Sequence, residues 1–188
     1  LAGAAVAVCE GNGAAARLVA ASRAARTLGL SAGMTLAQAR SILPDVIARH
    51  RDPLAERSAH EALLEAAGVL SPRVQDLAPD QALADVAGMD RLFPGDDGEL
   101  EMARTAVRTA ETLQLPIRVG VASTRLAARL AASCASSPTV VPSGGEAEFL
   151  APLPLTRLEL DRRLLTTLGR WGIVTAGDLA RLPADRVA

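Results

Sequence analysis

Residues 77–88 of this 188-residue chain read Leu77-Ala78-Pro79-Asp80-Gln81-Ala82-Leu83-Ala84-Asp85-Val86-Ala87-Gly88. The Pro-Asp step is a turn signal, because proline presets its backbone dihedral and an aspartate side chain can bond the backbone of its own turn. Apolar residues on both sides predict two short strands, so we interpret the stretch as a β-hairpin. Its turn presents Asp80 and Gln81. Two adjacent carboxylates there would favour a metal site, whereas a carboxylate beside a neutral amide does not.

The segments around the hairpin predict a ferredoxin-like unit. Hydrophobic periodicity indicates a long helix over 53–70, strands over 74–77 and 82–86, a second long helix over 99–113 and a buried strand over 116–122. This order becomes β-α-β-β-α-β when one strand is added on the N-terminal side. We therefore expect a mixed α+β, two-layer fold that lacks its first strand.

Residues 1–50 predict a small lobe beside that unit. Asn12-Gly13 is a hairpin turn signal between two apolar runs, and Ser22 and Thr35 are residues that typically cap helices. The elements expected in this lobe are strands over 4–8 and 16–20, helices over 23–28 and 36–43, and a strand over 46–49.

The sequence changes in character after Pro152-Leu153-Pro154. Two short helices over 160–168 and 175–182, joined by Gly169-Arg170-Trp171-Gly172, predict a helix-hairpin-helix. Such a motif can direct backbone N–H groups at a phosphate; the alternative is a helical hairpin that only packs. Between the hairpin unit and this region we expect a helix over 126–134 and a strand over 139–141.

The composition restricts the function classes. Hydrophobic residues make up 49% of the chain, which is ample for a core, and the net charge of −1 argues against a strongly basic nucleic-acid module. Cys9 and Cys134 are far apart, so a disulfide framework or zinc site is not predicted and a reduced, cytoplasmic compartment is favoured. No apolar run predicts a membrane span. The chain starts without Met and within a pattern, so we expect a piece of a longer protein.

The ordered segments resemble Y-family translesion DNA polymerases of the UmuC/DinB type. The residues that carry the resemblance are 21–34 (ASRAARTLGLSAGM, like the fingers segment), 71–74 (SPRV, before the catalytic hairpin), 119–122 (GVA strand), 126–131, and 149–154 with 172–179 (the entry into the thumb). The resemblance implies a fingers subdomain with a flanking palm strand at 1–50, a ferredoxin-like palm at 51–152 and the start of a helical thumb at 153–188.

Catalysis in this family is implied to use two divalent metals held by carboxylates. One aspartate belongs to the first palm strand, which is expected before Leu1, and the hairpin supplies an Asp-Glu pair. Asp80 matches the aspartate, and Gln81 replaces the glutamate. Asp80 is then a remnant metal-ligand position, or an aspartate that only caps its turn. We expect no cofactor, with Mg²⁺ required only if the chain is catalytic.

The positions implied to contact the nucleotide are also altered. The family's Tyr-x-x-Arg reads Arg23 and Arg26, and Ser136 stands where a lysine is implied. The Asn-Lys pair that opens the following helix reads Thr124-Arg125, and Glu159-Leu160-Asp161 replaces the Gly-x-Gly turn of the thumb. Our candidates for nucleotide or phosphate contact are therefore Arg23, Arg26 and Arg125.

Each candidate also has a structural alternative. Arg23, Arg26 and Arg40 form either a phosphate-facing patch or a solvated helix face. Arg125 and Arg129 lie four residues apart on one helix face, where they either contact phosphate or pair with acidic side chains.

Three functional hypotheses follow. The first is a catalytically silent family member that serves as a mutasome scaffold in DNA damage tolerance. Its implied partners are DNA, bound weakly by these residues alone, and a sliding clamp, an error-prone polymerase subunit and a RecA-like protein, all bound through regions outside this chain; its implied location is cytoplasmic and nucleoid-associated. The second is an active error-prone polymerase that transfers nucleotides with two Mg²⁺. The third is an unrelated α/β ligand-binding domain.

Overall fold

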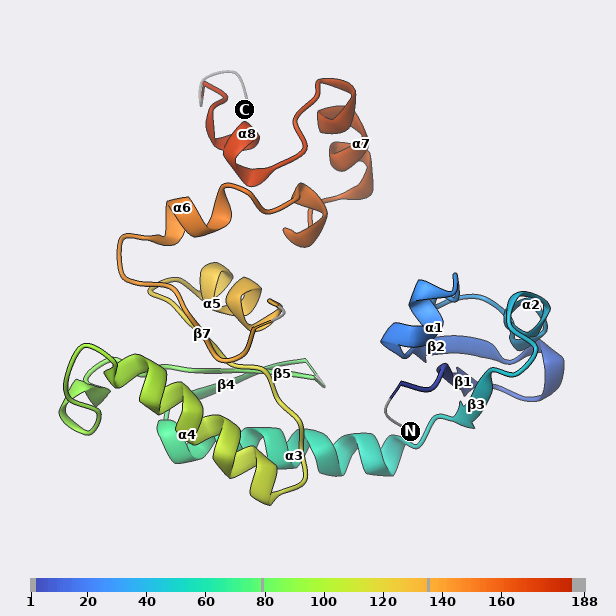
Figure 1. Ribbon diagram of the computed structural model, residues 1–188, viewed down its shortest axis with the longest axis horizontal. Helices are drawn as coiled ribbons and strands as arrows, with labels where there is room; N and C mark the ends of the chain where they lie inside the picture. Colours follow the sequence, from blue (N-terminus) through green and yellow to red (C-terminus); the bar gives the residue numbers. More distant parts are fainter. Residues whose placement is uncertain (1–2, 79, 135, 184–188) are drawn as a thin grey trace. The chain divides into compact units, whose positions relative to one another are not determined.

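A computed structural model of the chain describes residues 3–78, 80–134 and 136–183. Contacts divide the chain into two units, unit 1 (Leu1–Arg57) and unit 2 (Ser58–Ala188), and Figure 1 shows the elements of each. Within the described ranges, no helix combines the length and the apolar character needed to cross a membrane.

Unit 1 is built on a three-stranded sheet. Its strands are β1 (Val6–Glu10), β2 (Arg17–Ala21) and β3 (Ile47–His50), with β1 in the centre, antiparallel to β2 and parallel to β3. The hairpin predicted around Asn12-Gly13 is confirmed, because β1 and β2 pair antiparallel on either side of it. A one-turn helix η1 (Gly13–Ala15) follows Asn12, and the β1–β2 register shifts between Val8 and Cys9.

Side-chain caps fix the two helices of unit 1, α1 (Arg23–Thr27) and α2 (Leu36–Ile42). The Ser22 hydroxyl accepts a hydrogen bond from the Ala25 amide, and Thr35 forms a capping box with Gln38. These bonds satisfy amide groups that the first turn of a helix leaves without partners. The buried core of the unit comprises Ala7, Cys9, Ala16, Leu18, Ala25, Leu30, Leu36, Ala39 and Val46.

Two long helices and a hairpin carry the first part of unit 2. Helix α3 (Pro53–Leu70) runs into the unit from the end of unit 1, and the hairpin strands β4 (Val74–Ala78) and β5 (Gln81–Ala84) precede α4 (Gly98–Thr112). Figure 1 shows α3 and α4 beside this hairpin. Their core comprises Leu70, Met102, Ala103, Ala106 and Val121. The helix predicted over 53–70 is confirmed.

The strands of unit 2 form two separate pairs. Strand β6 (Gly120–Val121) pairs in parallel with β7 (Thr139–Val140), and no hydrogen-bonded ladder joins β5 to β6 among the described residues. The strand predicted over 116–122 is therefore wrong in length. Pro116 has no N–H to donate, and β7, which stops before Pro142, offers only two paired positions. A cleft of about 950 Å³ lies between the two pairs, over Met102 of α4.

Helix α5 (Arg125–Ala132) packs closely on β6. A Cβ atom added at Gly120 would lie 2.2 Å from the Ala128 carbonyl oxygen and 2.3 Å from the Ala132 amide nitrogen. Glycine therefore allows the strand to approach the helix backbone.

The remaining elements of unit 2 are η2 (Met89–Arg91), α6 (Glu146–Leu150), η3 (Leu155–Arg157), α7 (Arg162–Arg170) and α8 (Ala176–Ala180). The two helices predicted here are confirmed, with later starts because Asp161 and Thr175 cap them. Their buried core of Leu155, Leu168 and Ile173 is separate from the core around α4. Helix α6 was not predicted.

Candidate functional site

The β4–β5 hairpin carries the predicted remnant metal site. Gln75 pairs with Leu83 and Asp76 with Ala82, and the register shifts before the turn. Asp80 lies exposed in that turn, and Gln81 is the half-buried first residue of β5. Pro79 lies outside the described residues. The hairpin is confirmed, and it places one carboxylate beside one amide at its tip.

The acidic side chains along the hairpin are engaged elsewhere. Asp76 accepts a 3.1 Å contact from Nε2 of His60 on α3. Asp85 pairs with Arg73 at 3.3 Å and accepts a hydrogen bond from the Ala87 amide. Asp76 and Asp85 therefore pair with protein side chains, and not with each other around a common ligand position.

A two-metal site needs several charged oxygens within reach of each ion. Among the residues that the structure describes, no three His, Cys, Asp or Glu side chains lie close enough together to hold a metal ion. Asp80 with Gln81 offers one charged ligand group. The described residues alone therefore do not fit a two-Mg²⁺ centre.

Arg23 and Arg26 lie exposed on α1, three residues apart on a helix held firmly to its sheet. Ser22, the cap of α1, also accepts a hydrogen bond from the Val6 amide at 3.1 Å and donates one to the Ala4 carbonyl at 3.0 Å. Gly29, at φ +94°, follows Leu28, the C-terminal cap of the helix. Rigid positioning of two exposed guanidinium groups suits an anion ligand.

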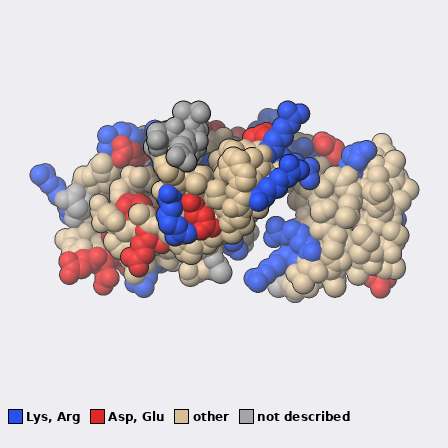
Figure 2. All heavy atoms as spheres, turned by 90° about the horizontal axis from the view of Figure 1, so that it is seen from above, with Lys and Arg blue, Asp and Glu red and all other residues tan. Residues whose placement is uncertain are grey.

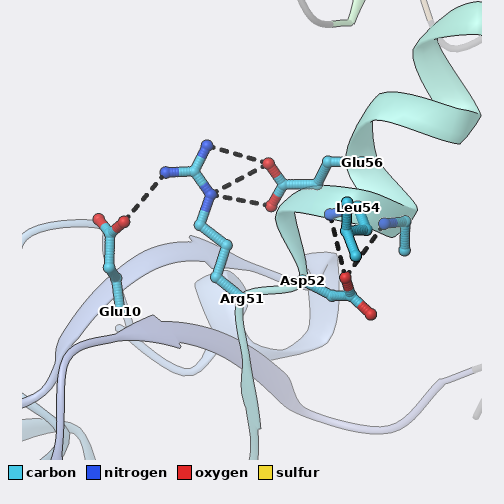
Figure 3. Close-up of polar contacts among 6 residues, drawn as sticks. Glu10, Arg51, Asp52, Leu54 and Glu56 are labelled. Carbon is cyan, nitrogen blue, oxygen red and sulfur yellow. Dashed lines mark hydrogen bonds and ion pairs between the residues drawn. The ribbon is translucent and has the colours of Figure 1, made fainter.

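Unit 1 is the more basic part of the chain. It holds seven arginines and four acidic residues, a charge of +3 with histidine neutral, whereas unit 2 carries −4. Arg51 bridges Glu10 at 3.3 Å and Glu56 at 2.9 Å, as Figure 3 shows, and these bonds raise the pKa of its guanidinium. The bridge fixes the start of α3 and involves two of the four acids.

Arg40 on α2 is exposed and lies near Cys9 in the sheet. Burial raises the pKa of the Cys9 thiol, and the charge of Arg40 opposes that rise. On the face drawn in Figure 2, basic and acidic side chains both appear among the other residues.

The two arginines of α5 have different surroundings. Arg125 is the exposed first residue of the helix, which Thr124 caps. Arg129 is half-buried, and its Nη2 lies 3.0 Å from Oε2 of Glu159. For Arg129 the structure thus shows pairing with an acidic side chain. Ser136 stands where the resemblance implies a lysine. Its side chain carries no positive charge, and the residue contacts Thr139.

Glu146 is a structural site that the sequence did not reveal. Its carboxylate accepts hydrogen bonds from the Ser123 hydroxyl, the Ser123 amide at 3.3 Å and the Gly144 amide at 2.9 Å. The Ser123 hydroxyl is the main cause that lowers the pKa of Glu146. Glu146 directly follows Gly144 and Gly145, and this pattern is a sequence signal for a carboxylate that accepts a hydrogen bond within its own turn. Nothing in the sequence indicates that Ser123 is its long-range partner.

Comparisons with known proteins place these features in a family context. A family model described as the impB/mucB/samB family matches residues 1–133. Protein ImuB of Caulobacter vibrioides is 30% identical over 161 residues, covering 86% of this chain and 34% of that protein. DNA polymerase IV of Dehalococcoides mccartyi is 30% identical over 173 residues, covering 89% and 43%. DNA polymerase IV 2 of Mesorhizobium japonicum is 33% identical over 169 residues, covering 87% and 40%.

Solved structures show the same fold. DinB from Sulfolobus solfataricus matches with a TM-score of 0.82 at 21% identity, covering 99% of this chain and 55% of that one. The insertion ternary complex of Dbh DNA polymerase matches with a TM-score of 0.81 at 20% identity, covering 97% and 55%. The predicted α+β, palm-and-fingers fold is confirmed. The chain spans roughly a third to two fifths of the length of the curated relatives it matches.

Proposed function

Because the chain belongs to the impB/mucB/samB family of Y-family polymerase-like proteins, we propose that it is a catalytically silent member that acts as a scaffold in DNA damage tolerance. The observation that carries the proposal is the hairpin tip. Asp80 stands beside Gln81, and within the described part of the chain no three His, Cys, Asp or Glu side chains gather closely enough to hold a metal ion. An amide in place of a carboxylate removes a full charge next to a divalent ion.

The contacts of the scaffold are part of the same proposal. DNA is the partner suggested by relatives named DNA polymerase IV and by the ternary complex among the solved neighbours. Exposed Arg23 and Arg26 on the basic unit 1, and Arg125 on α5, are the residues offered for its phosphates or for a nucleotide. A sliding clamp, an error-prone polymerase subunit and a RecA-like protein bind through regions outside these residues, in a cytoplasmic, nucleoid-associated assembly.

An active error-prone polymerase is the second candidate function. It is supported by the DNA polymerase IV relatives of Dehalococcoides mccartyi and Mesorhizobium japonicum, which are 30% and 33% identical to this chain, against 30% for ImuB. In that case Asp80 would bind Mg²⁺ together with carboxylates supplied from elsewhere in the protein. The third hypothesis, an unrelated α/β ligand-binding domain, is wrong, because the family model covers most of the chain.

A genetic experiment separates the scaffold from the polymerase. The gene is replaced in its own host by an Asp80→Ala allele or by a deletion, and damage-induced mutation frequency is measured. A scaffold predicts that the deletion lowers the mutation frequency while Asp80→Ala leaves it at the wild-type level, with protein abundance checked by immunoblot. An Asp80→Ala allele that behaves like the deletion would contradict the proposal and favour the polymerase.

A further inference from the structure

The helical end of unit 2 meets α5 through polar contacts. Its own buried core, Leu155, Leu168 and Ile173, is separate from the core under the β4–β5 hairpin. The segment 155–161, which runs from η3 to the cap of α7, faces α5 and contributes two charged side chains to that contact.

Four residues make this contact, and we call them the α5 latch: Arg129, Ser133, Arg157 and Glu159. Arg129 and Ser133 lie one turn apart on α5. Nη2 of Arg129 is 3.0 Å from Oε2 of Glu159, and Nη1 of Arg157 donates to the Ser133 hydroxyl at 3.2 Å. Two neighbouring positions on one helix face are thus joined to two positions of one short segment.

The backbone of Glu159 is held in an unfavourable conformation. Its φ is +54°, in the left-handed region that favours glycine and that other residues adopt at a cost. A glycine would follow the same path without strain, but it would give Arg129 no carboxylate. The glutamate therefore gives Arg129 a carboxylate partner at the cost of a strained backbone.

The carboxylate of Glu159 pairs with the guanidinium group of Arg129, which would otherwise be able to bind a phosphate. Arginine binds carboxylate and phosphate through the same N–H donors. The Arg129 side chain is 31% exposed and that of Glu159 is 68% exposed, so a ligand can reach the pair from solvent. Arg125, exposed one turn earlier on α5, would lie beside a phosphate bound there.

We propose that Glu159 is an intramolecular competitor for nucleic-acid phosphate: its carboxylate covers Arg129, closes the 155–161 segment on α5, and must be displaced before α5 binds DNA. The proposal rests on the proposed function, because the competing ligand is DNA. It assigns Glu159 an autoinhibitory role that is separate from the hairpin tip, and it predicts a gain of binding when the carboxylate is neutralised.

The binding experiment uses the full-length protein and a fluorescein-labelled primer–template duplex, followed by anisotropy at low salt. Glu159→Gln is expected to bind up to about five-fold more tightly than wild type, the range of an exposed ion pair. Arg129→Gln combined with Glu159→Gln is expected to lose this gain. Glu159→Gly removes the carboxylate and the backbone strain together, so it should show the same gain in a fully folded protein.

Glu101→Gln is the matched control. It makes the same change of net charge and frees Arg104 and Arg108 on α4, which Glu101 pairs with at 3.8 and 2.7 Å. A gain for Glu159→Gln that exceeds the gain for Glu101→Gln supports the competition. Equal gains would overturn it, because net charge alone would then explain the effect. A gain that survives in the double variant, whose net charge equals that of wild type, would also overturn it, because the gain would then not depend on Arg129.

Hydrogen exchange without DNA gives a second readout. Amides of residues 155–161 are expected to exchange several-fold faster in Glu159→Gln than in wild type, because the latch is broken. Unchanged exchange would overturn the latch. If no variant bound DNA, the competition and the DNA-binding part of the proposed function would both fail. Faster exchange in Glu159→Gln would then show that Glu159 only holds the 155–161 segment against α5.

Discussion

At the scale of single residues, a few side chains decide what this polymerase-like fold can do. Gln81 leaves Asp80 without a second carboxylate at the hairpin tip. Arg23 stands where the family resemblance implies a tyrosine, so α1 presents two exposed arginines. Glu159, in the turn before α7, pairs with Arg129. All three differences are visible in the sequence, but only the structure shows which arginine Glu159 contacts.

The pKa of Glu146 makes stability depend on pH. Hydrogen bonds from Ser123 and Gly144 lower that pKa below its usual value. A depressed folded-state pKa contributes stability that is present above the unfolded-state pKa, about 4.3 for glutamate, and lost as pH falls through the folded-state pKa. We expect Glu146→Gln to be less stable than wild type at neutral pH, and the difference to shrink below pH ~4. Urea unfolding across this pH range checks it; a difference that stays constant with pH would contradict the prediction.

Gln114, just after α4, offers a stabilising substitution. Its φ is +56°, and the Leu115 amide bonds back to the Ala110 carbonyl, as at helix ends that usually carry glycine. Gln114→Gly should stabilise unit 2 by about 0.5–1 kcal/mol. Gln114→Ala, which keeps the strain, is the control and should show no such gain in thermal unfolding. Destabilisation by glycine would mean that the glutamine side chain makes a contact that outweighs the strain.

At the scale of elements, the sequence predicts well where the signal is local. Helix α3 matches its prediction because eighteen residues carry one continuous amphipathic pattern after a proline start. Strand β6 is shorter than its apolar run suggests, since pairing depends on what the distant β7 can offer. Helix α6 is five residues long and has no side-chain cap at its start, whereas the equally short α1 and α8 are marked by Ser22 and Thr175.

Gly120 tests the packing of β6 on α5. Alanine there would place its Cβ 2.2–2.3 Å from helix backbone atoms, which cannot move as a flexible side chain can. Gly120→Ala should destabilise unit 2 by about 1–3 kcal/mol or more. Gly169→Ala in α7, where the added Cβ meets nothing within 4 Å, is the matched control and should be neutral or stabilising by up to ~1 kcal/mol. Equal effects in denaturant unfolding would contradict the close β6–α5 contact.

At the scale of the whole molecule, the order of the motifs along the sequence predicts both the family and the fold, and both are confirmed. The charge of each unit can be counted from the sequence once the boundary is known, but a long-range ion pair cannot be predicted from it. Unit 1 carries +3 and unit 2 carries −4, and the arginine at 129 is covered by an acid 30 residues further along. Long-range pairs of this kind depend on tertiary packing, which periodicity and turn signals do not encode.

The central claim is that the family's polymerase reaction has been lost at the hairpin tip. Template-dependent primer extension by the full-length protein, with Mg²⁺ and with Mn²⁺, tests it most directly. We expect wild type and Asp80→Ala to give the same background, with an active Y-family polymerase as the positive control. Robust extension by wild type that Asp80→Ala abolishes would contradict the claim.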